Sequence, residues 1–347
     1  MDILLKLLFF IFMLGGLIFA HELGHFLAAM RFNIRVKEFG LGLPPRAVRL
    51  FEWRGTSFTL NWIPLGGFVR PLGEFDPSVA GGLAASKPWQ RIVVFAAGPL
   101  MNLVVGYLIL VVAFSLGWPD QLKVIDVLPD SPAASAGLQV NDIFLRANGQ
   151  VIHDNYEWGL LVKANLERPI ALEVQRGEAV VPLTLTPNTA WAATAHPTGL
   201  AFTRLIVRYS PLAASRRALE RIALQIHETV MLPVRALLGQ LAPDEARLSG
   251  LVGLKQISDK ILDDAIAGRW LYPVLNLTAL ISVGLGFMNL LPFAALDGGR
   301  IAFALLEILR RRPVDARREK LVHVVGMVAL LGFMLALVVQ DLLKPVF

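Results

Sequence analysis

Four long apolar segments constrain the fold of this chain more than any other feature. Each is long enough to cross a hydrocarbon layer about 30 Å thick as a helix; they cover residues 4–30, 92–117, 273–291 and 321–339. With 55% hydrophobic residues and a mean hydropathy of +0.58, the chain is too apolar for an ordinary soluble protein. Because a helix satisfies its own backbone hydrogen bonds in lipid, the sequence predicts an α-helical polytopic membrane protein with four transmembrane helices.

The basic residues predict how these helices are oriented. Residues 31–91 and 300–320 form short loops rich in Arg and Lys, and positively charged short loops stay in the cytoplasm. We therefore expect both termini and the long stretch 119–270 to be extracytoplasmic, in a bacterial inner membrane. The net charge of +6 is explained by these loops, so no nucleic-acid partner is expected. The chain has no cysteine, which excludes disulfides, a thiol nucleophile and Cys-ligated metal.

The first apolar segment carries the motif His21-Glu22-Leu23-Gly24-His25. On a helix both imidazoles and the Glu22 carboxylate share a face, so they can converge on one point. This pattern is typical of a zinc site in which the Glu is the general base. It also occurs by chance in soluble helices, but at membrane depth ionisable groups are costly and indicate function. We therefore interpret the segment as a retained span and not a cleaved signal peptide.

Two histidines leave a catalytic zinc short of one protein ligand, and Asp297 is the best candidate for the third. Spans one and three run in the same direction, so the motif and Asp297 reach a similar depth. The alternative is that Asp297 only caps an amphipathic helix over residues 301–309. The matching depth favours the ligand. The other four histidines show no ligand spacing and are predicted to have surface or packing roles; they are His153, His196, His227 and His323.

The loop after the first span contains short β-type runs separated by turn residues, at residues 39–42, 47–53, 57–62 and 64–69. We predict a β-hairpin region on the cytoplasmic side, against the metal helix. Its edge could bind an unfolded substrate segment as an added strand, or the hairpin could only plug the helix bundle.

The polar stretch after the second span predicts a separate α+β domain. Strands are expected at residues 123–127, 143–147, 170–175 and 180–185, and helices at 132–136 and 155–164. This order, with Ser131-Pro132-Ala133 and Asn148-Gly149, resembles an extracytoplasmic PDZ domain of the bacterial protease type. Such domains bind extended peptides or free C-termini.

A basic amphipathic helix is expected over 211–241, either at the membrane interface or packed under this domain. The predicted organisation is a first membrane half with two helices and the β-hairpin region (1–118), the PDZ domain (119–205), amphipathic linker helices (206–270) and a second membrane half with two helices (271–347).

Taken together, the motifs resemble the site-2 protease family of intramembrane zinc metalloproteases, and more narrowly its bacterial branch, the regulator of sigma-E protease. The segments that carry the resemblance are His21 to His25, Gly98-Pro99-Leu100-Met101-Asn102, the PDZ-like insert and Asn289 to Gly299. The resemblance implies Zn²⁺ held by His21, His25 and Asp297, Glu22 as base and acid, and Asn289 assisting substrate or oxyanion binding. It also implies regulated intramembrane proteolysis of pre-trimmed single-span proteins, such as anti-sigma factors, or of remnant signal peptides. Two departures are Ala294, where the family has a second proline, and room for one PDZ domain instead of two.

Two other functions were weighed. A catalytically silent PDZ scaffold for envelope proteins would not need Glu22 beside two metal ligands. A metal transporter using the same three ligands would be expected to show internal repeats, which are not found between the two halves of the spans.

Overall fold

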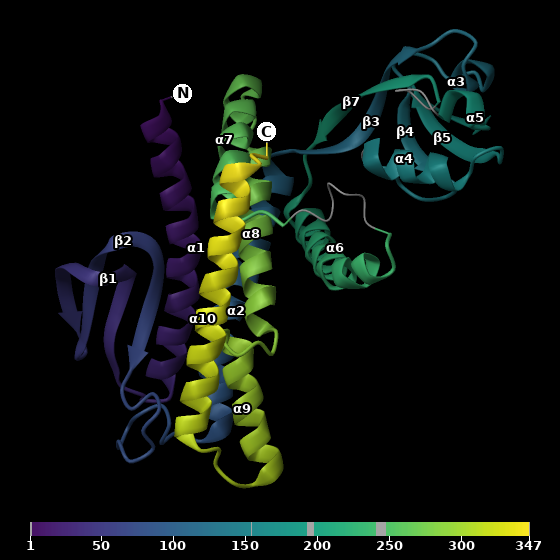
Figure 1. Ribbon diagram of the computed structural model, residues 1–347. Coiled ribbons are helices and arrows are strands. Elements are labelled where there is room, and N and C mark those ends of the chain that lie inside the picture. The colour runs from purple at the N-terminus through teal and green to yellow at the C-terminus, as the bar shows by residue number, and fades with distance from the viewer. Residues whose placement is uncertain (1, 154, 193–197, 241–247, 347) are drawn as a thin grey trace. The chain divides into compact units, whose positions relative to one another are not determined.

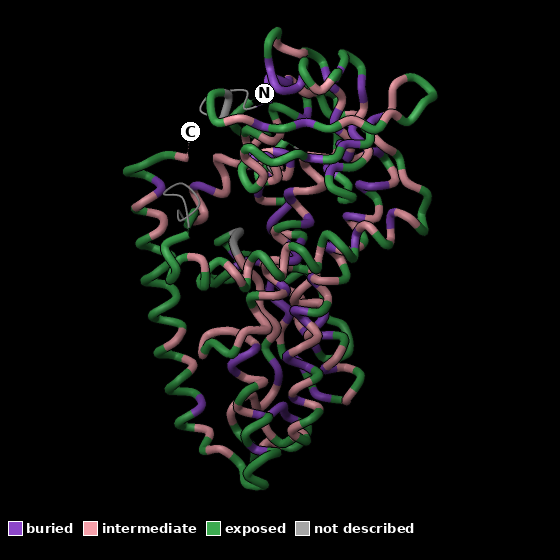
Figure 2. The backbone as a smooth tube through the Cα atoms, turned by 90° about the vertical axis from the view of Figure 1, so that its right-hand side faces the viewer, coloured by how far each residue is buried: buried purple, intermediate pink, exposed green. Residues whose placement is uncertain are grey.

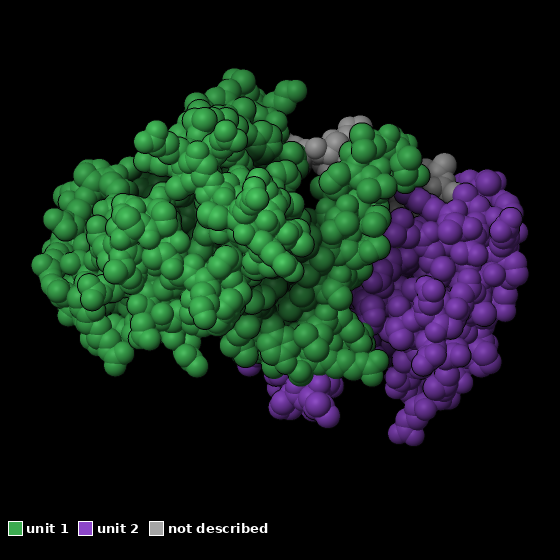
Figure 3. Space-filling view, turned by 90° about the horizontal axis from the view of Figure 1, so that it is seen from below, with its two compact units in different colours: residues 1–112, 215–347 green, residues 113–214 purple. Residues whose placement is uncertain are grey.

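The computed structural model describes residues 2–153, 155–192, 198–240 and 248–346. Its contacts divide the chain into two compact units (Figure 3). Unit 1 contains residues 1–112 and 215–347, and unit 2 contains residues 113–214. The two ends of the chain, which carry the motif and Asp297, therefore belong to one unit.

Within the described residues, four helices are long and apolar enough to cross a membrane (Figure 1). They are α1 (Ile3–Arg31), α2 (Pro88–Leu116), α8 (Tyr272–Leu290) and α10 (Ala316–Leu343). Many of their large apolar side chains are exposed, most of all on α10 (Figure 2). Lipid, unlike water, carries no penalty for such a surface. The prediction of a polytopic membrane protein is confirmed, and the four helices lie within a few residues of the predicted spans.

The apolar spacing of α1 explains which of its faces is buried. Phe10, Met13 and Leu14 follow the helical repeat and pack against Leu277 of α8 and against α7 (Leu251–Gly268), and Leu17 is also buried. Further along the same helix, Phe26 and Ala29 pack against residues 34–39 and against α2. This inward stripe continues through positions 21 and 25, so both motif histidines face the interior of unit 1.

Small residues let α2 approach α1 and α8 closely, as is common between membrane helices. A Cβ added to Gly24 would collide with the carbonyl of Ala97, and one added to Gly286 would lie 2.7 Å from the carbonyl oxygen of Pro99. The Ser282 hydroxyl on α8 donates to the carbonyl oxygen of Asn102 at 2.8 Å. These contacts fix α2 beside the motif helix.

The predicted β-hairpin region consists of β1 (Val36–Trp53) and β2 (Thr56–Pro71), joined at Arg54-Gly55, where both residues have positive φ as a tight hairpin turn requires. Both strands bend and fold back on themselves. Residues 38–41 of β1 consequently pair with residues 57–60 on one side and with 67–70 on the other, and Val36 pairs with Pro71. In the described residues of this sheet, 67–71 is an edge, and β2 contacts α1. The four predicted runs are thus four neighbouring strand segments made from two long strands.

Unit 2 is built around an antiparallel sheet, which in the described residues has five strands in the order β6-β5-β4-β3-β7. The strands are β3 (Trp118–Val127), β4 (Ile143–Ala147), β5 (Ile170–Arg176), β6 (Ala179–Leu185) and β7 (Leu200–Val207). The helices are α3 (Pro132–Ser135), α4 (Asn155–Ala164) and α5 (Thr189–Ala192). β4 and α4 have the predicted limits. β7 and α5 were not predicted.

The core of unit 2 is closed by apolar and ionic contacts between its strands and helices. Phe144 and Trp158 meet edge to face at 5.1 Å between ring centres, and both are buried. Asp142 accepts two hydrogen bonds from the Arg176 guanidinium, at 2.8 and 2.7 Å. Burial raises the pKa of Asp142, but these bonds and that from the Gln139 amide outweigh it and hold the pKa below its usual value.

Three further helices complete the chain: α6 (Pro211–Leu237), α7 and α9 (Asp297–Arg310). In unit 1, Gln225 of α6 donates to the Leu280 carbonyl of α8 at 2.8 Å. The carboxylate of Asp341 on α10 accepts from the amides of Gly250 and Gly253 at 2.8 and 2.7 Å, which satisfies orphan donors at the start of α7. α9 lies at the end of α8 and is tied to α2 by the buried pair Arg91–Glu307, at 2.8 Å.

Candidate metal centre

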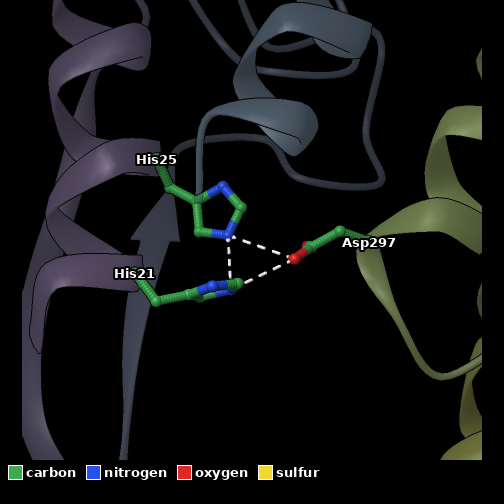
Figure 4. A group of neighbouring side chains, drawn as sticks. All are labelled: His21, His25 and Asp297. Carbon is green, nitrogen blue, oxygen red and sulfur yellow. Dashed lines mark hydrogen bonds and ion pairs between the residues drawn. The ribbon is translucent and has the colours of Figure 1, made fainter. Parts of the chain in front are cut away.

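Three potential metal-ligand atoms from α1 and α9 converge on one point, although about 270 positions of sequence separate them. His21 Nε2 lies 3.2 Å from His25 Nε2 and 3.2 Å from Asp297 Oδ2, and His25 Nε2 lies 3.4 Å from that same oxygen. Figure 4 shows the three side chains pointing toward one another. The side chains of the two histidines are 12% exposed and that of Asp297 is 17% exposed.

The chemistry and spacing of these donors fit a zinc ion. Zinc bonds to imidazole nitrogen and carboxylate oxygen are about 2.0–2.2 Å long, so tetrahedral ligand atoms lie roughly 3.3–3.5 Å from one another. The three distances agree with those edges within about 0.2 Å. Three protein ligands leave the fourth tetrahedral position for water or substrate, as in catalytic zinc sites.

The helix positions explain why the donors face one another. His21 and His25 are one helical turn apart on the inward stripe of α1. Asp297 is the first residue of α9, whose N-cap residue is Leu296 and makes no side-chain cap. The Asp297 carboxylate contacts the imidazoles, and a negative charge in the first turn also complements the helix dipole.

The orientation of His25 is fixed by the backbone of α2. Its Nδ1 lies 2.7 Å from the carbonyl oxygen of Val94. A carbonyl oxygen can only accept, so Nδ1 carries the proton and Nε2 keeps its lone pair for a metal. His25 thus lies in the tautomer that a metal ligand needs.

The donors line a cavity of about 660 Å³ in unit 1. Its wall combines α1, the end of β2, the start of α2, α8, α9 and α10. The sequence-predicted site residues on this wall are His21, Glu22, His25, Asn289 and Asp297. The fold therefore brings together all five residues that the sequence nominated, while their individual roles stay predictions.

β2 holds Glu22 in place. The backbone of Val69 hydrogen-bonds to the Glu22 carboxylate. A Cβ added to Gly67 would lie 3.2 Å from Glu22 Cγ, so the strand passes directly beside this side chain. The edge segment 67–71 is consequently next to the predicted base.

Asn289 lies at the end of α8, on the same wall. Its amide nitrogen donates to the Leu285 carbonyl of its own helix at 3.0 Å. The amide oxygen is the atom that this bond leaves for other partners.

The sequence reasoning missed a charged cluster on the cavity wall. Arg300 pairs with Glu74 at 2.6 Å and lies 3.3 Å from His323 Nε2, while His323 Nδ1 lies 2.8 Å from the carbonyl oxygen of Ala294. Arg300 is three residues after Asp297 and could have been noticed on that ground. Glu74 and His323 carried no local signal. His323, for which a surface or packing role is predicted, lies on the cavity wall.

The remaining two histidines in the described residues do not line the cavity. His153 Nδ1 pairs with Asp120 in unit 2 at 2.8 Å, and His227 belongs to α6 and does not line the cavity. His196 lies outside the described residues.

Comparisons with known proteins point to one protein family. The sequence pattern of peptidase family M50 matches residues 9–333. A Clostridium perfringens protein that is provisionally named a zinc metalloprotease is 34% identical, over 98% of this chain and 99% of its own length. The zinc metalloprotease RasP of Geobacillus kaustophilus is 27% identical, over 96% and 97% of the two chains. The regulator of sigma-W protease RasP of Bacillus subtilis is 26% identical, with the same coverage.

The family match covers most of the chain and includes both halves of the donor set, and the relatives align over nearly their whole length. The chain therefore belongs to peptidase family M50, the site-2 protease family of membrane-embedded zinc metalloproteases.

Proposed function

We propose that this protein is an intramembrane endopeptidase in which His21, His25 and Asp297 hold Zn²⁺ and Glu22 transfers protons. The observation that carries the proposal is the convergence of the three donor atoms at tetrahedral spacing, beside Glu22 and inside one cavity.

Zinc, when bound, supplies a Lewis acid that polarises the scissile carbonyl and makes water more acidic. Glu22 accepts the proton of the attacking water and then delivers it to the leaving amine as the peptide bond breaks. The hydrogen bond from Val69 holds the carboxylate toward the cavity, and Asn289 offers its amide oxygen on the same wall.

The edge of β2 supports a substrate that binds as an extended strand. Residues 67–71 pair with β1 on one side, and Val69 faces Glu22 on the other. An unwound substrate segment added along this edge would gain backbone hydrogen bonds and pass beside the proton-transferring group. Local unwinding is required, because peptide bonds in a substrate helix are shielded by their own hydrogen bonds.

The proposed substrates are single-span membrane proteins already trimmed outside the membrane, of the anti-sigma factor type, or remnant signal peptides. The Bacillus subtilis relative, named as the regulator of sigma-W protease, supports this class. We place the centre toward the cytoplasmic side of a bacterial inner membrane, with both termini periplasmic, from the basic residues 31–91 and 300–320.

Unit 2 is proposed to be the PDZ domain. Its antiparallel sheet, its helix α4 and the position of β7 at an edge of the sheet, among the described strands, support that assignment. A peptide bound there would extend the sheet at that edge. The silent-scaffold alternative is not adopted, since Glu22 lies on the wall of the same cavity as the three donors.

The test measures zinc content and cleavage of a tethered single-span substrate in detergent or proteoliposomes. Glu22→Gln should keep zinc and lose about 10²- to 10⁴-fold in cleavage rate, because only the proton transfer is removed. His21→Ala and Asp297→Asn should lose zinc as well as activity. Wild-type cleavage by Glu22→Gln, or unchanged zinc content in Asp297→Asn, would contradict the respective assignment.

A further inference from the structure

The second nitrogen of His21 faces a side chain that no part of the proposed mechanism uses. Asn102 lies on α2, 81 positions after His21, and is 1% exposed. Its Nδ2 is 3.3 Å from His21 Nδ1. The other ring nitrogen of His21, Nε2, faces Asp297 and is the one proposed to bind the metal.

Zinc binding by His21 would determine whether its second ring nitrogen needs a hydrogen-bond donor or an acceptor. An imidazole that binds zinc through Nε2 carries its proton on Nδ1, and that N–H requires an acceptor. His25 has such an acceptor in the Val94 carbonyl oxygen. For His21, Asn102 is the polar group at hydrogen-bonding distance from Nδ1, and its amide can offer an oxygen or a nitrogen.

The amide oxygen of Asn102 is the second observation. Within the described residues, this Oδ1 is buried and has no hydrogen-bond partner. A buried carbonyl oxygen without a hydrogen-bond partner is unfavourable. The two ends of an amide have the same shape, so a half-turn about the Cβ–Cγ bond exchanges Oδ1 and Nδ2 without altering the packing. That rotation gives the oxygen a donor and gives the His21 N–H an acceptor, and it moves Nδ2 to the place that Oδ1 held. The rotated amide is favoured because a protonated Nδ1 of His21 would otherwise face the N–H groups of Nδ2.

The backbone at Asn102 is hydrogen-bonded to the neighbouring helix α8. The Ser282 hydroxyl donates to the Asn102 carbonyl oxygen at 2.8 Å, and both residues are buried. The side chain is therefore held at a fixed height against His21, and α2 orients both motif histidines, one through a carbonyl oxygen and one through an amide.

We propose that Asn102 is a positioning residue that accepts a hydrogen bond from His21 Nδ1–H and so holds His21 as a zinc ligand through Nε2. This inference rests on the proposed function, because it takes His21 to be a zinc ligand. It adds a residue from a third helix to a centre otherwise built from α1 and α9.

The experiment measures zinc affinity by chelator competition, and the visible spectrum of the cobalt-substituted protein, in the full-length protein in detergent. Asn102→Leu keeps the approximate size and removes both polar atoms. We expect it to weaken zinc binding roughly 10- to 100-fold, as is usual when a ligand's hydrogen-bond partner is lost. Asn102→Asp presents an acceptor of the same shape. Its zinc affinity should therefore stay within about threefold of the wild-type affinity.

The pair of variants separates the possible roles. If the aspartate variant loses as much affinity as the leucine variant, the amide acts as a donor or as a packing group, and the proposal is wrong. Wild-type affinity in Asn102→Leu would also overturn it. Asn102→Ala carries the same comparison if the leucine variant is not monodisperse.

A parallel His21→Ala measurement keeps the two proposals distinguishable. If His21→Ala retains zinc at wild-type affinity, the ligand set of the proposed function fails. If His21→Ala loses zinc while Asn102→Leu keeps it, only the role of Asn102 is refuted.

Discussion

At the scale of single residues, the proposed metal centre depends on a glycine as well as on the side chains of its ligands. Gly98 on α2 lies directly against the His25 ring, and an added Cβ would meet Nε2 first and Cε1 at 2.6 Å. The hydrogen atom of glycine leaves open the space beside a donor nitrogen. Gly98 therefore leaves space beside a nitrogen that is proposed to bind the metal.

This close approach predicts the effect of Gly98→Ala. Alanine favours a helix over glycine, so the backbone does not oppose the change. The methyl group should nevertheless displace the His25 ring and lower zinc affinity by more than about tenfold, since loss of ligand orientation has effects of that size. Zinc competition on the purified variant measures this. Gly15→Ala on α1, where nothing lies within 4 Å of the added Cβ, is the matched control and should bind zinc normally.

At the scale of elements, α9 carries Asp297 and is held by two sets of ionic contacts. Near its start Arg300 pairs with Glu74, and further along Glu307 pairs with Arg91 of α2. Arg91 also lies 3.5 Å from Glu319 at the start of α10. Because these three side chains are at most 9% exposed, the cluster locks α2, α9 and α10 together with charges that water does not screen.

Breaking this cluster on one side should be costly. Arg91→Met leaves two buried carboxylates without their cation, and about 3–5 kcal/mol of stability should be lost. Unfolding of the detergent-solubilised protein by denaturant or heat provides the measurement. Arg216→Met, which breaks the exposed pair with Glu220, should change stability by less than about 1 kcal/mol.

A triple variant with Arg91, Glu307 and Glu319 all replaced by methionine checks the cause. Since no unpaired charge remains, most of the lost stability should return. A triple variant as unstable as Arg91→Met would show that packing, not charge, is responsible.

At the scale of the whole molecule, the two ends of the chain form one unit and the metal donors lie entirely within it. A ligand that binds only the folded state stabilises the part that it bridges. Zinc would therefore join α1 to α9, while unit 2 holds its own core, formed by residues such as Phe144 and Trp158.

Metal removal should consequently act on one unit. Hydrogen exchange of the full-length protein, followed by mass spectrometry with and without a zinc chelator, should show lost protection in peptides of α1 and α9. Peptides of β3 to β7 should exchange at unchanged rates. Equal loss of protection in both units would mean that unit 2 depends on the centre, and no change in either would argue against zinc as a structural bridge.

Features that depend on local composition and period could be predicted from the amino-acid sequence alone. Hydropathy is summed over neighbouring residues, so the four spans were predicted to within a few residues, and helical spacing placed His21, Glu22 and His25 on one face. The comparison of depths also led correctly to a convergence of Asp297 with the two histidines. Only the tertiary structure decided which distant groups meet: the charged cluster of Glu74, Arg300 and His323, the sheet order in which residues 67–71 become an edge beside Glu22, and the contact of Asn102 with His21. Such contacts join residues tens to hundreds of positions apart, and they leave no periodic signal in the chain because packing between elements, not local preference, creates them.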